Sequence, residues 1–136
     1  MVTTKRRIAR WCAFAAAALI CAALLLTSFI WVPALRERLA RRSFESSRWK
    51  DASENAHGNP VRLRMVDDLL SRFDLVGMKR TDVVDLLGER DDTEYFKSYD
   101  MVYWLGPERG VFSIDSEWLV LRVQGDRVIE ARVVRD

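Results

Sequence analysis

An uncharged, apolar run near the start of the chain limits its fold more than any other feature. Residues 11–32 read WCAFAAAALICAALLLTSFIWV, and no charged residue occurs between Arg10 and Arg36. A helix rises about 1.5 Å per residue, so about 20 such residues cross the roughly 30 Å of a bilayer's hydrocarbon core. Trp11 and Trp31 stand at the two ends, where indole rings favour the membrane interface. We therefore expect residues 11–32 to form a single transmembrane helix in contact with the lipid bilayer.

A cleaved signal peptide is the alternative interpretation of the same run. Val32 to Ala34 could serve as a small-residue cleavage site. The apolar run, however, is longer than the roughly 7–15 residues typical of the hydrophobic part of a signal peptide. A lipoprotein signal is not favoured either, because Ile20 precedes Cys21 where a small residue is expected. The sequence thus favours an uncleaved anchor.

The charges of the chain divide unevenly along its length. Residues 1–60 carry ten Lys or Arg and four Asp or Glu, a net charge of +6, whereas residues 61–136 carry twelve and sixteen, a net charge of −4. The acidic C-terminal part argues against nucleic-acid binding, which normally needs a positive face. The basic part suits anionic lipid headgroups. Because Lys and Arg flank the apolar run on both sides, charge alone gives no membrane orientation.

The apolar run and the charges divide the chain into four segments. They are a basic N-terminal tail, a transmembrane helix, a basic juxtamembrane connector and an α+β binding domain, at residues 1–10, 11–32, 33–60 and 61–136. The first part of the connector is either a helix on the headgroups, with Leu35, Leu39 and Phe44 facing lipid, or a solvated basic stretch. Its second part, ESSRWKDASENAHGNP, has the composition of a loop.

Two short helices are expected at the start of the domain. Apolar residues recur at helical spacing over residues 61–73, after Asn59 as a cap residue and Pro60 in the first turn. A second helix ends at Gly88, since glycine readily takes the left-handed conformation that closes many helices. Thr81 either caps this helix or lies one turn inside it. Because so short a helix is not stable alone in water, it must dock against the rest of the domain.

Three segments with β-branched and aromatic residues follow, and they predict an antiparallel meander. They are Tyr99–Leu105, Glu117–Gln124 and Arg127–Arg135. Gly125-Asp126 is a two-residue hairpin signal between the last two, and Val111–Asp115 is a candidate for a further short strand. The predicted fold class is therefore α+β, with both short helices packed on one face of a three- to four-stranded antiparallel sheet.

Alternation along the predicted strands gives this sheet two apolar faces. The residues expected to face the helices are Met101, Tyr103, Leu105, Leu119, Leu121, Val123, Ile129, Ala131 and Val133. The opposite face carries Val102, Trp104, Trp118 and Val120. A one-layer sheet has no core on that side, so these four residues are predicted to form an exposed surface that binds a protein partner or the 33–60 connector. The alternative is that the 106–116 loop folds over them.

The sequence contains no recognisable catalytic or metal-binding motif. The single histidine, His57, has no cysteine or second histidine near it, whereas a zinc site needs several such ligands at set spacing. Acidic clusters occur at Asp67-Asp68, at Asp91-Asp92, and at Asp115 with Glu117. Solvation explains them better than acid–base chemistry, and a hydrolase would require Asp115 and Glu117 to meet in a cleft. We therefore expect no enzyme activity, no cofactor and no metal.

The stretch from Gly77 to Gly88 resembles the signature of the SmpA/OmlA (BamE-like) family of small envelope lipoproteins. The matching residues are Gly77, Met78, Val83, Leu87 and Gly88, and Tyr103-Trp104 and Gly125–Val128 fall in places comparable to the family's aromatic strand and its turn. The resemblance covers about residues 61–136. It implies a two-helix, antiparallel-sheet fold, also similar to β-lactamase-inhibitor proteins, and an extracytoplasmic binding scaffold. Lys79 and Arg90 differ from the family pattern, and an apolar helix stands in place of the lipid-bearing cysteine.

These observations lead to one expected function and one alternative. We expect a non-enzymatic, single-pass protein of the plasma (inner) membrane, with its C-terminal domain outside the cytoplasm. That domain binds a protein partner in cell-envelope assembly or maintenance. The alternative is a membrane-tethered inhibitor or regulator of an enzyme. Co-purification with envelope-assembly proteins favours the first, and co-purification with one stoichiometric enzyme favours the second.

Overall fold

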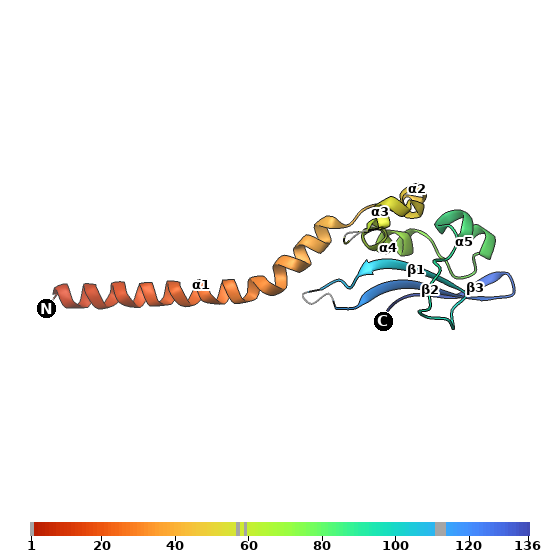
Figure 1. The fold of residues 1–136 in the computed structure, drawn as a ribbon. Coiled ribbons are helices and arrows are strands. Elements are labelled where there is room, and N and C mark those ends of the chain that lie inside the picture. Colours follow the sequence, from red (N-terminus) through yellow and green to blue (C-terminus); the bar gives the residue numbers. More distant parts are fainter. Residues whose placement is uncertain (1, 57, 59, 111–113) are drawn as a thin grey trace. The chain divides into compact units, whose positions relative to one another are not determined.

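The computed structural model describes residues 2–56, 58, 60–110 and 114–136, which form an α+β chain (Figure 1). The chain divides into two compact units, residues 1–36 and residues 37–136. Helix α1 (Val2–Ala40) forms the first unit as far as Arg36, and its last four residues belong to the second unit. The large apolar side chains described between Trp11 and Trp31 are all at least 51% exposed.

The predicted transmembrane anchor at residues 11–32 lies within α1. Among the described residues, no single helix is long and apolar enough to cross a membrane. One bent pair, Phe14–Phe29 and Trp31–Ala40 with 52° between them, meets that requirement by length and composition alone. The anchor therefore stays a prediction.

The second unit is built on a three-stranded antiparallel sheet in the order β1-β2-β3. The strands are β1 (Met101–Pro107), β2 (Ser116–Gln124) and β3 (Arg127–Arg135). Gly125 has φ 64°, the positive value that a two-residue hairpin turn favours, and it joins β2 to β3 with Asp126. The predicted meander is confirmed. Of the candidate strand Val111–Asp115, residues 111–113 lie outside the described residues.

Two helices of this unit occupy nearly the predicted ranges. They are α4 (Val61–Arg72) and α5 (Arg80–Leu87). Gly88 follows α5 with φ 82°, which confirms the expected stop. Thr81 lies inside α5 rather than capping it, and Asn59, the predicted cap of α4, lies outside the described residues.

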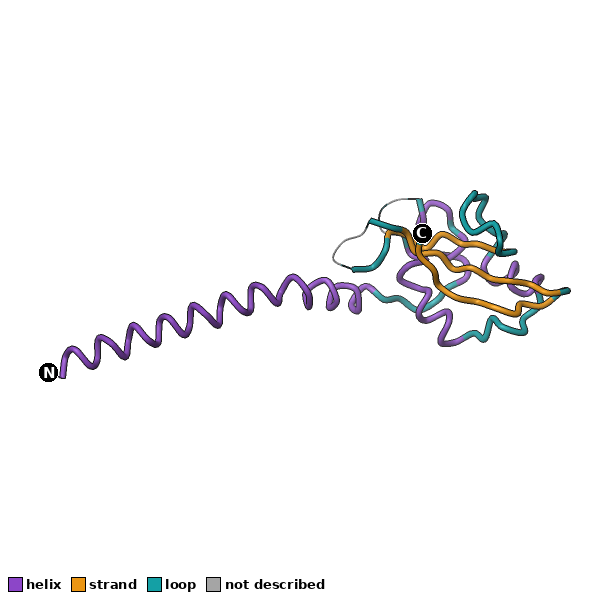
Figure 2. Tube along the Cα trace, turned by 90° about the horizontal axis from the view of Figure 1, so that it is seen from below, coloured by secondary structure: helices purple, strands orange, loops and turns teal. Residues whose placement is uncertain are grey.

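The helices cover one face of the sheet and enclose the main core with it. Figure 1 shows α4 and α5 above the strands, and Figure 2 shows the strands side by side from below. The cluster includes five sheet residues predicted to face the helices, each at most 1% exposed: Met101, Tyr103, Leu105, Leu119 and Leu121. Val123, Ala131 and Val133 pack at its margin. The predicted α+β fold, with helices on one sheet face, is therefore confirmed.

Ile129 departs from the predicted alternation. Val123 lies opposite Val128 and Arg122 opposite Glu130, so Ile129 is an extra residue on β3, a β-bulge. Because of the bulge, Val128 and Ile129 lie on the opposite faces of the sheet from those predicted. Val128 is 1% exposed and belongs to the main core, whereas Ile129 is 48% exposed. The prediction that Ile129 faces the helices is wrong for this reason.

Much of the predicted connector at residues 33–60 belongs to the folded domain. It contains two short helices, α2 (Ser46–Lys50) and α3 (Ala52–Asn55). Trp49 of α2 is fully buried. The ring of Phe44 lies 5.7 Å from that of Trp49 and 5.4 Å from that of Phe73, so Phe44 packs on the domain rather than on lipid. The prediction of a separate connector is wrong for these residues.

Polar residues that suggested a loop instead fix this segment. The side-chain amide of Asn55 donates to the carbonyl oxygens of Trp49 and Asp51, at 3.0 and 2.8 Å. The Asp51 carboxylate accepts a hydrogen bond from the Ser53 N–H at 2.8 Å, which caps α3. Asx and Ser side chains make such local bonds in loops and at helix caps alike, so composition alone did not separate the two.

The burial of Trp49 predicts a large loss of stability on truncation. Trp49→Ala should lower the free energy of unfolding by about 3–5 kcal/mol, because it removes a fully buried indole from the core. Urea unfolding of the full chain measures this. The exposed neighbour Ser47 gives a matched control, since Ser47→Ala should change stability by less than about 0.5 kcal/mol. Equal effects of the two variants would mean that α2 is not part of the folded domain.

Candidate functional site

The residues predicted as a partner-binding surface do lie together, as cross-strand pairs. Val102 is opposite Val120 and Trp104 opposite Trp118 on β1 and β2. They belong to a second apolar cluster, distinct from the main core. Only Trp104 is half-buried, whereas Val102, Trp118 and Val120 are 3%, 7% and 0% exposed. The four residues form a small second core, so the prediction of an exposed surface is wrong.

The segment of residues 89–100, between Gly88 at the end of α5 and the start of β1, covers this second core and is called the cover segment. Figure 1 shows it passing from α5 around the end of the sheet to the face opposite the helices. The rings of Tyr95 and Phe96 lie 5.4 and 6.0 Å from that of Trp118, and Tyr99 is 7% exposed. The 33–60 connector, one predicted occupant of this face, packs on the other sheet face instead. The 106–116 loop, the alternative cover, includes residues outside those that the structure describes. The sequence signal for the observed cover, which the prediction did not use, is the three aromatic residues within ERDDTEYFKSYD.

Tyr99 fixes the cover segment to the sheet. Its hydroxyl oxygen accepts a hydrogen bond from Arg132 Nε at 3.0 Å. The guanidinium carbons of Arg122 and Arg132 lie 5.0 and 5.5 Å from the ring centre, within the range of cation–π attraction. The hydrogen bond to Tyr99 is the largest cause that raises the pKa of Arg132. The outer face of the sheet is therefore closed by aromatic and guanidinium groups.

Asp91 forms hydrogen bonds with the outer edge of β1. The prediction that it is a solvated acid is therefore wrong. Its N–H donates to the Val102 carbonyl oxygen at 2.9 Å, and its Oδ2 accepts from the Trp104 N–H at 2.7 Å. Arg62 Nη1 lies 2.8 Å from the same carboxylate oxygen. Asp91 therefore joins the edge strand to α4.

Arg62 extends this junction to the N-terminal part of the domain. Its side chain is only 11% exposed. Arg62 Nε donates to the Trp49 carbonyl oxygen at 3.0 Å, and its guanidinium carbon lies 5.6 and 5.8 Å from the ring centres of Trp49 and Tyr103. One side chain thus contacts α2, β1 and the loop that carries Asp91.

Glu117 and Arg109 form a second, largely buried ion pair. Glu117 is 1% exposed, and the N–H and Nε of Arg109 donate to it at 3.0 and 2.9 Å. Arg109 Nη1 donates to Asp67 at 3.0 Å. Burial alone would lower the pKa of Arg109, but its hydrogen bonds to Glu117 and Asp67 raise it well above the ordinary value. Asp115 is exposed, so the two acids that a hydrolase would need lie in different surroundings.

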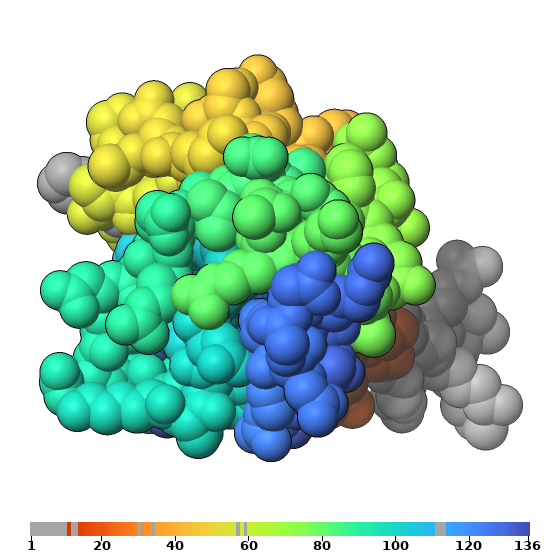
Figure 3. All heavy atoms as spheres, turned by 90° about the vertical axis from the view of Figure 1, so that its right-hand side faces the viewer, coloured from red at the N-terminus to blue at the C-terminus, as the bar shows by residue number. Residues whose placement is uncertain are grey.

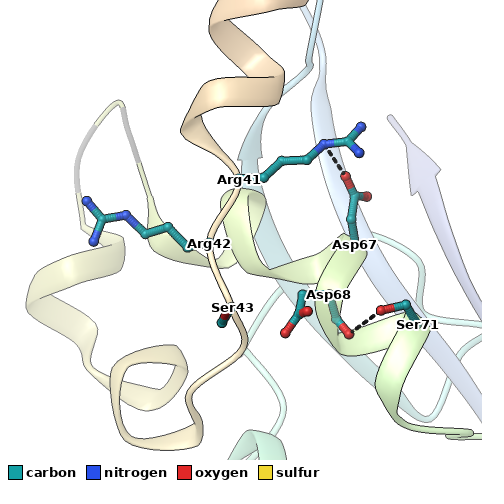
Figure 4. A pocket seen from close by; sticks show the side chains of 6 residues that line it. All are labelled: Arg41, Arg42, Ser43, Asp67, Asp68 and Ser71. Carbon is teal, nitrogen blue, oxygen red and sulfur yellow. Dashed lines mark hydrogen bonds and ion pairs between the residues drawn. The ribbon is translucent and has the colours of Figure 1, made fainter.

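A hollow of about 420 Å³ lies between α4 and the chain that follows α1 (Figure 4). Its lining residues are Arg41, Arg42, Ser43, Asp67, Asp68 and Ser71. Arg41 Nε lies 3.1 Å from Asp67, whose predicted role as a solvated acid is therefore wrong. The Asp68 carboxylate accepts from the Phe44 N–H at 2.6 Å and from Arg72 at 3.0 Å. The acids of this hollow hold the chain after α1 against α4.

Four acids of the predicted clusters accept hydrogen bonds from arginine or backbone N–H groups: Asp67, Asp68, Asp91 and Glu117. A carboxylate that accepts several hydrogen bonds from arginine and backbone N–H groups is held in place rather than free to take a substrate proton. Among the described residues, no three His, Cys, Asp or Glu side chains are grouped to hold a metal ion. His57 lies outside the residues that the structure describes.

Comparisons with protein families, with curated proteins and with solved structures give no match for this chain. The resemblance to the SmpA/OmlA family therefore remains a prediction that rests on the residues of its signature.

The Asp91 junction predicts a measurable loss of stability. Asp91→Ala should lower the free energy of unfolding by about 2 kcal/mol, since it removes the carboxylate partner of Arg62 and the acceptor of the Trp104 N–H. Denaturant titration measures the change. Asp92 is the adjacent, exposed acid, and Asp92→Ala should stay within about 0.5 kcal/mol of the parent. If both variants lose the same stability, Asp91 is not a structural junction.

The surroundings of Asp68 predict a component of acid sensitivity. The Phe44 N–H first, and Arg72 second, lower the pKa of the Asp68 carboxyl. A lowered pKa in the folded state stabilises the fold above the unfolded value of about 3.9, and that stability is lost as the pH falls through the folded pKa. Unfolding midpoints measured from pH 5 to pH 2 should therefore fall less steeply for Asp68→Asn. Identical slopes for parent and variant would contradict this.

Proposed function

We propose that this chain is a non-enzymatic, single-pass membrane protein whose C-terminal domain binds a protein partner in cell-envelope assembly or maintenance. Residues 11–32 act as the tether in the plasma (inner) membrane, and the domain lies on the extracytoplasmic side. The partner is held by surface contacts of the domain rather than by a reactive centre.

The observation that carries this proposal is the exposed apolar side of α1. Between Trp11 and Trp31 the large apolar side chains that the structure describes are at least 51% exposed, and no charged residue interrupts the segment. A helix that is apolar on all sides is unfavourable in water and favourable in a hydrocarbon core. A compact domain that follows such a helix is thereby kept at a membrane surface.

The ionisable groups of the domain support a binding role. Asp67, Asp91 and Glu117 each lie in ion pairs with Arg109 or Arg62, which join separate segments of the chain. These groups stabilise a rigid domain, and rigid scaffolds lose little conformational freedom when they bind a partner.

The glycines of the family signature support the BamE-like fold as part of this proposal. Gly77 and Gly88 bound the α5 region with φ values of 89° and 82°, conformations that residues with a Cβ atom rarely adopt. The positive φ values thus give a conformational reason for glycine at these two positions of the signature. The two helices α4 and α5 on an antiparallel meander also agree with the fold that the resemblance implies.

Charged substitutions in α1 test the proposal. In the doubly substituted Leu19→Arg, Leu25→Arg chain, each arginine would lie within the bilayer core at a cost of roughly 2.5–3.5 kcal/mol. The parent should stay in the carbonate-washed membrane fraction, and the double variant should leave it. Leu39→Arg is the matched control, because Leu39 is exposed but lies outside residues 11–32, and it should remain in the membrane.

Chemical cross-linking in cells that express the parent or the double variant identifies the partner. The parent should give an adduct with an envelope-assembly protein, and the adduct should be lost from the double variant. A single stoichiometric enzyme in the adduct would favour the inhibitor or regulator instead. Retention of the double variant in washed membranes would contradict the tether.

A further inference from the structure

The last turns of α1 have two different sides. Glu37 and Ala40 share one side by helical spacing and are half-buried, and the Glu37 carboxylate lies 3.9 Å from Arg109 Nε. Leu35 and Leu39 are one turn apart on the opposite side of the helix, and they are 48% and 77% exposed. Neither leucine belongs to an apolar cluster of the described residues. The end of α1 is therefore an amphipathic helix whose apolar side is exposed.

Two arginines stand beside these leucines and carry unpaired positive charge. Arg36 and Arg38 are exposed, and their side chains form no ion pair or hydrogen bond with any residue that the structure describes. The next two arginines differ from them. Arg41 pairs with Asp67 at 3.1 Å (Figure 4), and Arg42 lines the hollow that holds this acid. The charge that is free to bind an anion is thus at Arg36 and Arg38.

These residues follow directly after the apolar run at residues 11–32. At about 1.5 Å per residue, Leu35 and Leu39 lie roughly 5–10 Å beyond Val32 along the helix, about the thickness of the headgroup layer of a bilayer. Pro33 lies inside α1. A proline inside a helix removes a backbone hydrogen bond and favours a bend, so the turns that follow can incline along a bilayer surface.

Leucines flanked by arginines on one side of a helix are typical of a segment that lies in a membrane interface. The leucines enter the boundary between headgroups and acyl chains, and the arginines pair with anionic lipids. The attraction of a charged surface acts over about a Debye length, roughly 8 Å at physiological salt. Arg36 and Arg38 lie about 6 and 9 Å beyond Val32 along the helix, so both are within reach of the headgroup charge.

We propose that residues 35–39 bind an anionic lipid surface, with Leu35 and Leu39 in the interface and Arg36 and Arg38 on lipid phosphates. The covalent link to residues 11–32 selects this occupant over a protein from solution, because the anchor keeps the bilayer beside the segment at a high effective concentration. The inference rests on the membrane tether of the proposed function and adds a class of lipid to its partners.

A spin label at position 39 is the probe. Leu39→Cys is made in the full chain with Cys12→Ala and Cys21→Ala, and the labelled chain is reconstituted into vesicles of phosphatidylcholine alone or mixed equally with phosphatidylglycerol. Electron paramagnetic resonance measures collisions of the label with a water-soluble nickel chelate. We expect about threefold fewer collisions on the anionic vesicles, and high salt should abolish this difference because it screens the headgroup charge.

Substitution of the arginines tests the contribution of charge. Arg36→Gln with Arg38→Gln should return the collisions on anionic vesicles to the level on phosphatidylcholine. Arg90 and Lys97 provide the matched control, since they are exposed in the cover segment, which Figure 3 shows in turquoise-green at the surface of the domain. Arg90→Gln with Lys97→Gln removes the same charge and should behave as the labelled parent. Equal effects of the two double variants would overturn the role of Arg36 and Arg38.

Substitution of Leu35 tests the apolar contact. Leu35→Ser should raise the collisions of the label on anionic vesicles by about threefold, because the segment loses one of its two leucines. Leu70 is a matched control, as it is 39% exposed on α4, and Leu70→Ser should leave the collisions unchanged. If Leu35→Ser also leaves them unchanged, Leu35 does not contact the lipid.

The outcomes separate this inference from the proposed function. A label equally accessible to the chelate on both kinds of vesicle would overturn the binding of residues 35–39 to lipid. A label equally shielded on both would overturn the selection of anionic lipid. In either case, a chain that stays with carbonate-washed vesicles leaves the tether standing, whereas a chain that the wash removes would overturn the tether and this inference together.

Discussion

The contacts of Arg62 are the interaction on which the rest of the domain depends. This nearly buried guanidinium joins the carbonyl oxygen of Trp49, the carboxylate of Asp91 and the rings of Trp49 and Tyr103. A buried charge is tolerated only when it is paired and its donors are satisfied. Arg62 meets this condition only when α2, α4, β1 and the loop before β1 come together. Its position in the first turn of α4 therefore couples the N-terminal segment of the domain to the sheet.

Other arginine contacts repeat this use of charge at the edges of the fold. Arg109 joins Glu117 on β2 to Asp67 on α4, and Arg132 on β3 holds Tyr99 of the cover segment. Each pair connects segments that are distant in the sequence. The domain thus uses its arginines and acids to fix both faces of a small sheet.

The sequence was sufficient where structure is decided locally. Helical spacing placed α4, the glycine after Leu87 marked the end of α5, and Gly125 marked the hairpin, because each signal lies within a few residues of its effect. Burial that depends on distant partners was not predictable in this way. Trp49 was predicted to lie in a loop because its core contacts, apart from Phe44, come from the distant elements α4 and β1. Val102 and Trp118 were predicted to be exposed because the aromatic residues of the cover segment stand among charged residues in the sequence, which hides their apolar character. The bulge at Ile129 had no local signal, and it exchanged the faces of two residues.

The central claim, that charged side chains of this domain act as junctions between segments, is tested most directly by a double-mutant cycle. Arg62→Met, Asp91→Asn and the combined variant are compared with the parent by urea unfolding. The account predicts an interaction energy of about 1–3 kcal/mol between the two residues, because each loses its partner in the single variants. Additive effects, with an interaction energy below about 0.5 kcal/mol, would contradict it.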